Sequence, residues 1–179
     1  MSGDLIILTG PPGAGKTTVA THVARGRPKA VHLHTDDFWH AIVSGAIPPY
    51  EPPSDPQNQT VLRVIASAAF AYADGGYTTV VDGIVGPWMT DHFRRQMSTY
   101  LRVPVHYVVL RPDRETTLAR ARARSDAEAL TDPEPITAMW DQFAGLGVME
   151  AHVLDTTDDT VDVTVPRVVD AVENGAYRL

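Results

Sequence analysis

Short runs of apolar residues alternate along the chain with longer segments in which apolar residues recur at helical spacing. Residues 5–8 are continuously apolar and end at a turn rich in glycine and proline, a pattern typical of a strand buried on both faces. The segment 16–25 places valines and alanines on one side of a predicted helix. Further strands are predicted at 31–34, 77–82, 103–110 and 152–155. Further helices are predicted at 38–44, 57–74, 89–101, 113–124, 136–143 and 161–174.

This alternation predicts an α/β fold with a parallel five-stranded sheet covered by helices on both faces, in three layers. No internal repeat, linker or low-complexity tract interrupts the sequence, so residues 1–179 are expected to form a single domain. Residues 46–56 hold five prolines and should form an ordered or partly mobile loop rather than a helix. Pro133 and Pro135 should likewise break the chain before the helix at 136–143.

The amino-acid composition limits the classes of molecule that the protein is expected to bind. The net charge of -7 argues against charge-driven binding to nucleic acid or to an anionic membrane, because the long-range field repels phosphate. The absence of cysteine excludes disulfides, thiolate metal sites and a cysteine nucleophile. The sequence has neither a basic leader nor a run of about 20 apolar residues, so we expect a cytoplasmic protein without a membrane span.

One motif carries strong chemical information. A complete match to G-x-x-x-x-G-K-S/T lies between the first predicted strand and the first predicted helix, the context in which this P-loop pattern binds nucleotide phosphates. Its glycines allow a tight turn whose amides point at phosphate, and Lys16 would reach the terminal phosphates. The residues predicted to bind the nucleotide here are Gly10, Pro11, Pro12, Gly13, Ala14, Gly15, Lys16, Thr17 and Thr18.

The same motif predicts ATP with Mg²⁺ as the ligand. Thr17 would place its hydroxyl on the ion, and a carboxylate from a neighbouring strand would hold the water shell of the ion, a role best suited to Asp82. The alternative for Asp82 is an ordinary turn or capping aspartate after a strand.

A P-loop alone does not separate a motor, a switch and a kinase. Beyond residues 10–17, the segments 35–38 and 80–83 and the arginine-rich stretch 111–124 resemble those of the small P-loop phosphotransferases. That group includes chloramphenicol phosphotransferase, gluconate kinase, the kinase domain of T4-type polynucleotide kinase and the zeta-toxin kinases. The resemblance spans nearly the whole chain and implies one P-loop kinase domain with a small lid at about 111–135, whose mobile part would be 125–135.

The resemblance also implies a catalytic base after the second strand. In those families an aspartate at the position of Asp36 is thought to accept the proton of the acceptor hydroxyl. A carboxylate at hydrogen-bond distance can both orient the hydroxyl and take its proton. Asp37 competes for this role, but we expect it to cap the following helix instead.

Arginines would follow the negative charge of the migrating phosphoryl group. Arg120 and Arg124 lie four residues apart and project from one face of a helix, so they are the predicted catalytic pair, and Arg114 is a weaker candidate. The alternative is a solvated arginine face that pairs with Glu115 and Asp126.

The remaining contacts of the nucleotide and its acceptor are less sharply marked. The resemblance places adenine near residues 155–157, with Thr156 as the candidate, although an ordinary turn explains this segment equally well. An acceptor pocket is expected between residues 39–56, residues 83–88 and the lid. The aromatic residues near this pocket are Trp39, Tyr50 and Trp88, which either stack on an acceptor or, as we prefer, pack in the interior. The nearby histidines, His34, His40 and His92, are expected to cap helices or to pack.

The sequence therefore favours ATP-dependent phosphorylation of a small molecule bearing a hydroxyl group. The polynucleotide kinases carry an arginine where this chain has Trp39, which argues against a nucleic-acid acceptor. Two alternatives stay open: a nucleoside, nucleotide or polynucleotide 5′-hydroxyl kinase, and a nucleotide-binding ATPase or regulator that transfers nothing. The oligomeric state is not predicted.

Overall fold

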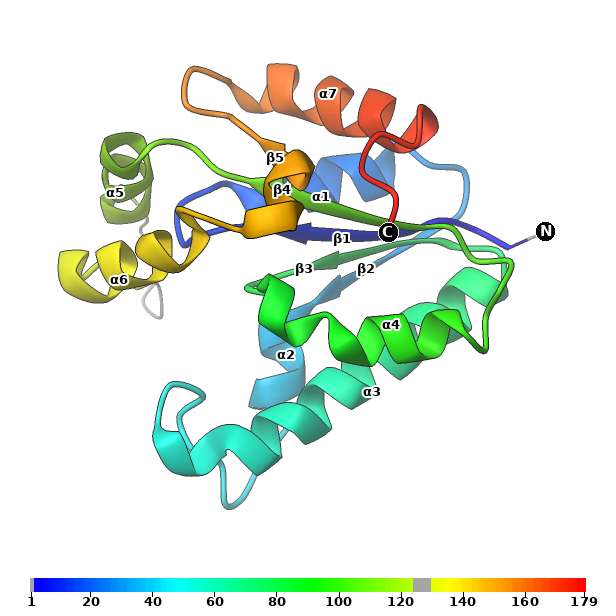
Figure 1. Ribbon diagram of the computed structural model, residues 1–179, viewed down its shortest axis with the longest axis horizontal. Coiled ribbons are helices and arrows are strands. Elements are labelled where there is room, and N and C mark those ends of the chain that lie inside the picture. The colour runs from blue at the N-terminus through cyan, green and yellow to red at the C-terminus, as the bar shows by residue number, and fades with distance from the viewer. Residues whose placement is uncertain (1, 124–129) are drawn as a thin grey trace.

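The computed structural model describes residues 2–123 and 130–179, and its centre is a parallel sheet (Figure 1). The strand order is β2-β3-β1-β4-β5, and every pairing in it is parallel. The predicted α/β fold with a parallel five-stranded sheet is thus confirmed. The strands are β1 Leu5–Thr9, β2 Ala30–His34, β3 Thr78–Asp82, β4 Val105–Leu110 and β5 Val153–Leu154.

Helices cover both faces of the sheet and give the predicted three layers. Alternate residues of β1 point to opposite faces, so Ile6 and Leu8 pack toward α1 and α7 while Leu5 and Ile7 pack toward α3 and α4. The α-helices are α1 Lys16–Arg25, α2 Thr35–His40, α3 Asp55–Asp74, α4 Asp91–Met97, α5 Arg114–Arg122, α6 Pro133–Phe143 and α7 Val161–Glu173. The short 3₁₀ helices are η1 Pro52–Ser54, η2 Pro87–Met89 and η3 Gly147–His152.

Several helix boundaries differ from the prediction, chiefly at prolines. Helix α6 begins at Pro133 rather than after Pro135, because a proline in the first turn has no N–H to leave unsatisfied. Asp132 accepts a hydrogen bond from the Glu134 amide and caps this helix. For the same reason α3 begins at Asp55, inside the segment predicted to be loop. The helix predicted at 89–101 is instead η2 followed by α4.

The sheet brings the carboxyl ends of β1, β2 and β3 to one edge. In the register of the strands Asp82 lies beside Leu8 on one side and beside His34 on the other. The turn after β1 and the start of α2 therefore meet around the end of β3. Within the described residues, no helix is long and apolar enough to cross a membrane.

Candidate functional site

The turn from Gly10 to Thr17 joins β1 to α1 and is held in a shape that only glycine supports. Gly13 has φ 87°, and a Cβ added there would lie 2.4 Å from the carbonyl oxygen of Thr117 in α5. Gly15 has φ 84° but faces open space, so its constraint is the backbone alone. Helix α1 has neither a side-chain cap nor an acidic residue in its first turn. No side chain of its own first turn thus caps its N-terminal amides, which suits a phosphate site.

Lys16 is not the surface lysine of an ordinary turn. Only 7% of the residue is exposed, and its Nζ donates a hydrogen bond of 2.9 Å to the carbonyl oxygen of Pro11. The ammonium group is therefore held over the turn that it follows.

Asp82 is the polar centre of the strand edge. It is fully buried, and its Oδ2 accepts a 2.6 Å hydrogen bond from the hydroxyl of Thr17. The other oxygen, Oδ1, lies 2.6 Å from Nε2 of His32 and 3.0 Å from Nδ1 of His34. Burial alone would raise the pKa of Asp82, but these hydrogen bonds from His32, His34 and Thr17 hold the pKa well below its usual range.

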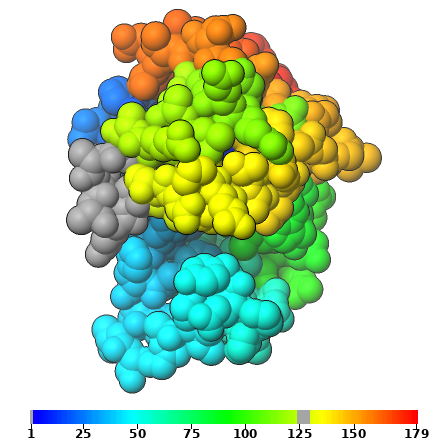
Figure 2. Space-filling view, turned by 90° about the vertical axis from the view of Figure 1, so that its left-hand side faces the viewer, coloured from blue at the N-terminus to red at the C-terminus, as the bar shows by residue number. Residues whose placement is uncertain are grey.

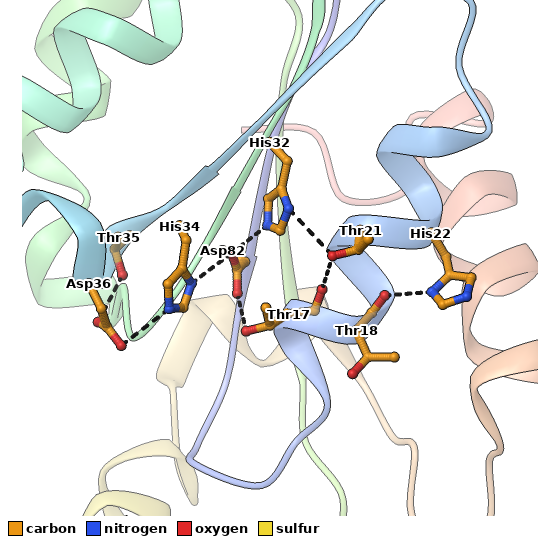
Figure 3. A network of polar contacts seen from close by, with 9 residues as sticks. All are labelled: Thr17, Thr18, Thr21, His22, His32, His34, Thr35, Asp36 and Asp82. Atoms are coloured by element: carbon orange, nitrogen blue, oxygen red, sulfur yellow. Dashed lines mark hydrogen bonds and ion pairs between the residues drawn. The ribbon is translucent and has the colours of Figure 1, made fainter. Parts of the chain in front are cut away.

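His34 joins Asp82 to Asp36. Its Nε2 lies 3.4 Å from Oδ2 of Asp36, so a single imidazole stands between two carboxylates (Figure 3). Hydrogen bonds with Asp36 and then Asp82 raise the pKa of His34 to about 10, against the opposing effect of burial. In turn the hydrogen bond with His34 lowers the pKa of Asp36. At neutral pH this arrangement favours an imidazolium flanked by two ionised carboxylates.

These histidines were missed as site residues. His34 was expected to cap or pack, and it does neither: the N-cap position of α2 is His34, but no side-chain hydrogen bond caps the helix. The available signal was the spacing of His32 and His34 on one strand, which places both on the same face.

Asp36 and Asp37 lie in the first turn of α2, because the helix begins at Thr35 rather than at Phe38. The expectation that Asp37 caps this helix is therefore wrong. Both carboxylates are exposed, and Asp36 borders a large cavity. The role of Asp36 as a base stays a prediction.

The predicted lid arginines have different surroundings. Arg120 uses Nη2 to donate to three carbonyl oxygens of the turn after β5, those of Thr156 and Thr157 at 3.2 Å and of Asp159 at 2.9 Å. It thereby ties α5 to the segment predicted to hold adenine. Arg124, and residues 125–129 of the predicted mobile part 125–135, lie outside the described residues.

Arg114, the weaker catalytic candidate, forms an ion pair with Asp141 of α6. Its guanidinium group also lies 5.3 Å from the ring centre of Trp140. Helices α5 and α6 therefore pack side by side at the edge of the site. Asp113 caps α5 by accepting from the Thr116 amide.

The turn after β5 is ordered by its own side chains. Asp155 accepts hydrogen bonds from the amide and hydroxyl of Thr157, at 2.9 and 2.6 Å. Thr156 is buried, and its hydroxyl has no hydrogen-bond partner among the described residues. A buried hydroxyl without a partner fits a position that a ligand completes, but adenine binding there stays a prediction.

A cavity of about 620 Å³ lies beside Asp36, between the segments predicted to form the acceptor pocket. It opens between α6 and residues 46–58, which are yellow and light blue to cyan in Figure 2. Trp39 is partly buried, as preferred, and donates from Nε1 to Oδ1 of Asn58 at 2.9 Å. For Tyr50 and Trp88, which are 86% and 55% exposed, the preferred interior packing is wrong. Both rings border the cavity instead.

Thr17 and Asp82 together offer a hydroxyl and a carboxylate beside the phosphate turn, which are the hard oxygen ligands that Mg²⁺ prefers. The donor set thus fits the predicted ion. Across the part of the chain that the structure describes, this site included, no group of three or more histidine or acidic side chains is arranged to hold a metal.

Comparisons with known proteins agree with this geometry. The sequence model for the AAA domain matches residues 5–146. No curated protein sequence matches the chain. Among solved structures, an unliganded sugar kinase of a Janibacter species is 22% identical, with a TM-score of 0.66 over 96% of this chain and 95% of that one.

Two further structures have similar folds. The APS kinase of Mycobacterium tuberculosis, in complex with AMPPNP and APS, is 18% identical, with a TM-score of 0.68 over 96% of this chain and 98% of that one. The shikimate kinase of Acinetobacter baumannii, in complex with shikimate, is 17% identical, with a TM-score of 0.66 over 97% and 94%. At these identities the likeness shows a common fold.

Proposed function

The chain belongs to the AAA domain family, and we propose that within it this protein is an ATP-dependent phosphotransferase that moves the γ-phosphoryl group of ATP to a hydroxyl of a small molecule. One observation carries the proposal. A chain of polar contacts runs from Thr17 through Asp82 and His34 to Asp36, and so from the phosphate turn to the edge of the 620 Å³ cavity. The proposed donor and acceptor sites are thus adjacent.

On the donor side, the amides of residues 10–17 and the ammonium of Lys16 would bind the phosphates of ATP. Thr17 and Asp82 would hold Mg²⁺, which supplies positive charge to the phosphate oxygens when bound. The low pKa of Asp82 keeps this carboxylate ionised and ready for that role at neutral pH.

On the acceptor side, Asp36 would receive a hydrogen bond from the acceptor hydroxyl and align its oxygen with the γ-phosphorus. A bond forms between these two atoms, the bond from phosphorus to the bridging oxygen breaks, and ADP leaves. The hydroxyl proton passes to Asp36 and then to solvent. Because the pKa of Asp36 is lowered, orientation is expected to be its larger contribution, which suits a loose transition state in which the proton leaves late.

Positive charge for the transition state would come from Lys16 and the lid arginines. Arg120 extends from α5 to the turn after β5, where it would support the nucleotide site. Arg124, which lies outside the described residues, is proposed as the second arginine that supplies this charge. The structurally similar APS and shikimate kinases, whose structures hold small acceptors, support an acceptor of similar size.

The experiment is an acceptor screen that follows ADP release and phosphorus NMR of the product. A hydroxyl compound should raise ADP release and appear as a phosphate ester, and Asp36→Asn should lower both on the order of 100-fold or more while still binding ATP. If every acceptor left ADP release unchanged, and Asp36→Asn hydrolysed ATP like the wild type, the alternative of a non-transferring ATPase would replace the proposal.

A further inference from the structure

The walls of the 620 Å³ cavity are mostly apolar. Side chains from six segments form them: α2, residues 46–50, the start of α3, Ile84, η2 and α6. The largest of these side chains are Trp39, Ile47, Tyr50, Trp88, Met89 and Met139. A ligand that fills this space must therefore present mainly apolar or aromatic surface.

Charge is nearly absent from the same walls. Among the described lining residues, none is lysine or arginine, Asp36 is the one carboxylate and His40 the one imidazole. The lowered pKa of Asp36 keeps that carboxylate negative at neutral pH. An anionic ligand would lose its hydration without gaining a cation from these described side chains, and it would also be repelled by Asp36.

The amides that line the cavity are largely engaged within the protein. Gln57 accepts from the Ile47 amide at 2.9 Å and donates to the Ile47 carbonyl oxygen at 2.7 Å. Asn58 accepts from Trp39 and donates to the Pro49 carbonyl oxygen at 2.8 Å and to Ser54 Oγ at 2.9 Å. Few polar groups remain to replace the water around a polyol.

These hydrogen bonds also fix the proline-rich segment. Ser54 is buried and donates to the carbonyl oxygens of Pro49 and Glu51, at 2.9 and 2.7 Å. Four prolines at 48–53 further restrict the backbone. The wall that carries Tyr50 is thus preformed, and a ligand does not have to order it.

We propose that this cavity takes an uncharged hydroxyl compound with an aromatic or alicyclic body and excludes acceptors that carry a carboxylate or a phosphate. The inference rests on the proposed function, because the hydroxyl would lie at Asp36, but it concerns binding and can be tested without transfer. Tyr50 and Trp88 would contact the apolar body from opposite segments, and Gln142 of α6 is the remaining amide on the rim.

The test uses isosteric alcohols that differ in charge, para-hydroxymethylbenzamide and para-hydroxymethylbenzoate. Calorimetric titration is done with the full chain, magnesium and a non-hydrolysable ATP analogue. The amide is expected to bind at least about tenfold more tightly than the benzoate. It should also bind more tightly than methyl glucoside and than para-hydroxymethylbenzylamine, which carries a positive charge. If any of these three binds as tightly as the amide, or if the amide shows no measurable binding, the inference is overturned.

Variants locate the binding. Tyr50→Ala and Trp88→Ala should each weaken binding of the amide by about 5- to 10-fold, since exposed rings contribute area to a ligand and little to folding. Tyr72→Ala, an aromatic on α3 that is 44% exposed and contacts Tyr77, is the matched control and should leave binding unchanged. If all three variants lost equal affinity for the amide, the placement of the ligand against Tyr50 and Trp88 would be overturned.

Gln142→Arg adds a cation at the rim and should bring the benzoate to within about threefold of the amide. An unchanged preference would contradict the electrostatic origin of the selectivity. Transfer is measured separately: selective binding of the amide with no phosphate ester formed would support the inference and refute the proposed function. Equal phosphoryl transfer to the amide and the benzoate would support the proposed function and refute the inference.

Discussion

The hydroxyl of Thr17 lies 2.6 Å from Oδ2 of the fully buried Asp82. This contact joins the first turn of α1 to the end of β3, across 65 positions of sequence. Both groups are hard oxygen ligands, and both lie beside the phosphate turn. The contact therefore supports a site in which the metal and the nucleotide bind together.

Thr17→Val removes the hydroxyl and keeps the shape of the side chain. We expect affinity for ATP with magnesium to fall on the order of 10- to 100-fold, because a ligand of the ion is lost. Affinity measured by calorimetry in EDTA should change much less, since the amides and Lys16 remain. Thr60→Val on α3 is the control and should behave like the wild type in both conditions. A loss of equal size with and without magnesium would refute the assignment of Thr17 to the ion.

Asp36→Asn keeps the size of the side chain and removes its charge. We expect kcat to fall on the order of 10²- to 10⁴-fold, since the acceptor hydroxyl loses the group that orients it and takes its proton. The KM for ATP should hardly change. Asp37→Asn, the neighbouring carboxylate in the same turn, is the matched control. A larger effect at Asp37 than at Asp36 would reverse the two assignments.

Arg120→Lys keeps the charge but loses the planar fork that reaches three carbonyl oxygens. We expect the free energy of unfolding to fall by about 1–2 kcal/mol in chemical denaturation. If Arg120 also acts on the phosphoryl group, kcat should fall further than this loss of stability explains, with KM little changed. Arg122→Lys, at an exposed position on the other side of α5, should alter neither quantity.

His106, which lies away from the site, should make the stability of the fold depend on pH. Burial lowers the pKa of this histidine from its ordinary value of 6.5, against the attraction of Asp4. The folded protein therefore binds fewer protons than the unfolded chain, and stability is lost as pH falls below about 6.5. His106→Gln cannot titrate, so its free energy of unfolding should fall less than that of the wild type between pH 7.5 and about 5.5. If the free energy of unfolding fell equally with pH in the two proteins, His106 would not contribute to the pH dependence of stability.

The parts of the fold encoded by neighbouring residues were predictable from sequence. The strand, turn and helix around Lys16 follow from an apolar run, three glycines and helical spacing within 21 residues, and α1 has the predicted bounds. The start of α6 differs from the prediction, because a break expected at Pro133 overlooks that a proline is favourable in a first turn.

Contacts that depend on strand order were harder to predict. His32 and His34 contact Asp82 because β2 lies next to β3, and nothing within either segment encodes that neighbour. The exposure of Tyr50 depends in the same way on hydrogen bonds from α3 to the proline-rich segment. The segments that border the cavity were therefore predicted from sequence, while the apolar character of its walls required the structure.

The paired hydrogen bonds between Gln57 and Ile47 have an evolutionary consequence. They bring the two ends of residues 47–57 together, so this stretch leaves and rejoins the fold at almost one point. Insertions, deletions or recombination within residues 48–54 can remodel one wall of the cavity while the paths of β2 and α3 stay as they are. Related proteins can thus keep the residues around the phosphate turn unchanged and differ in the ligand of the cavity by exchanging a single short stretch of chain.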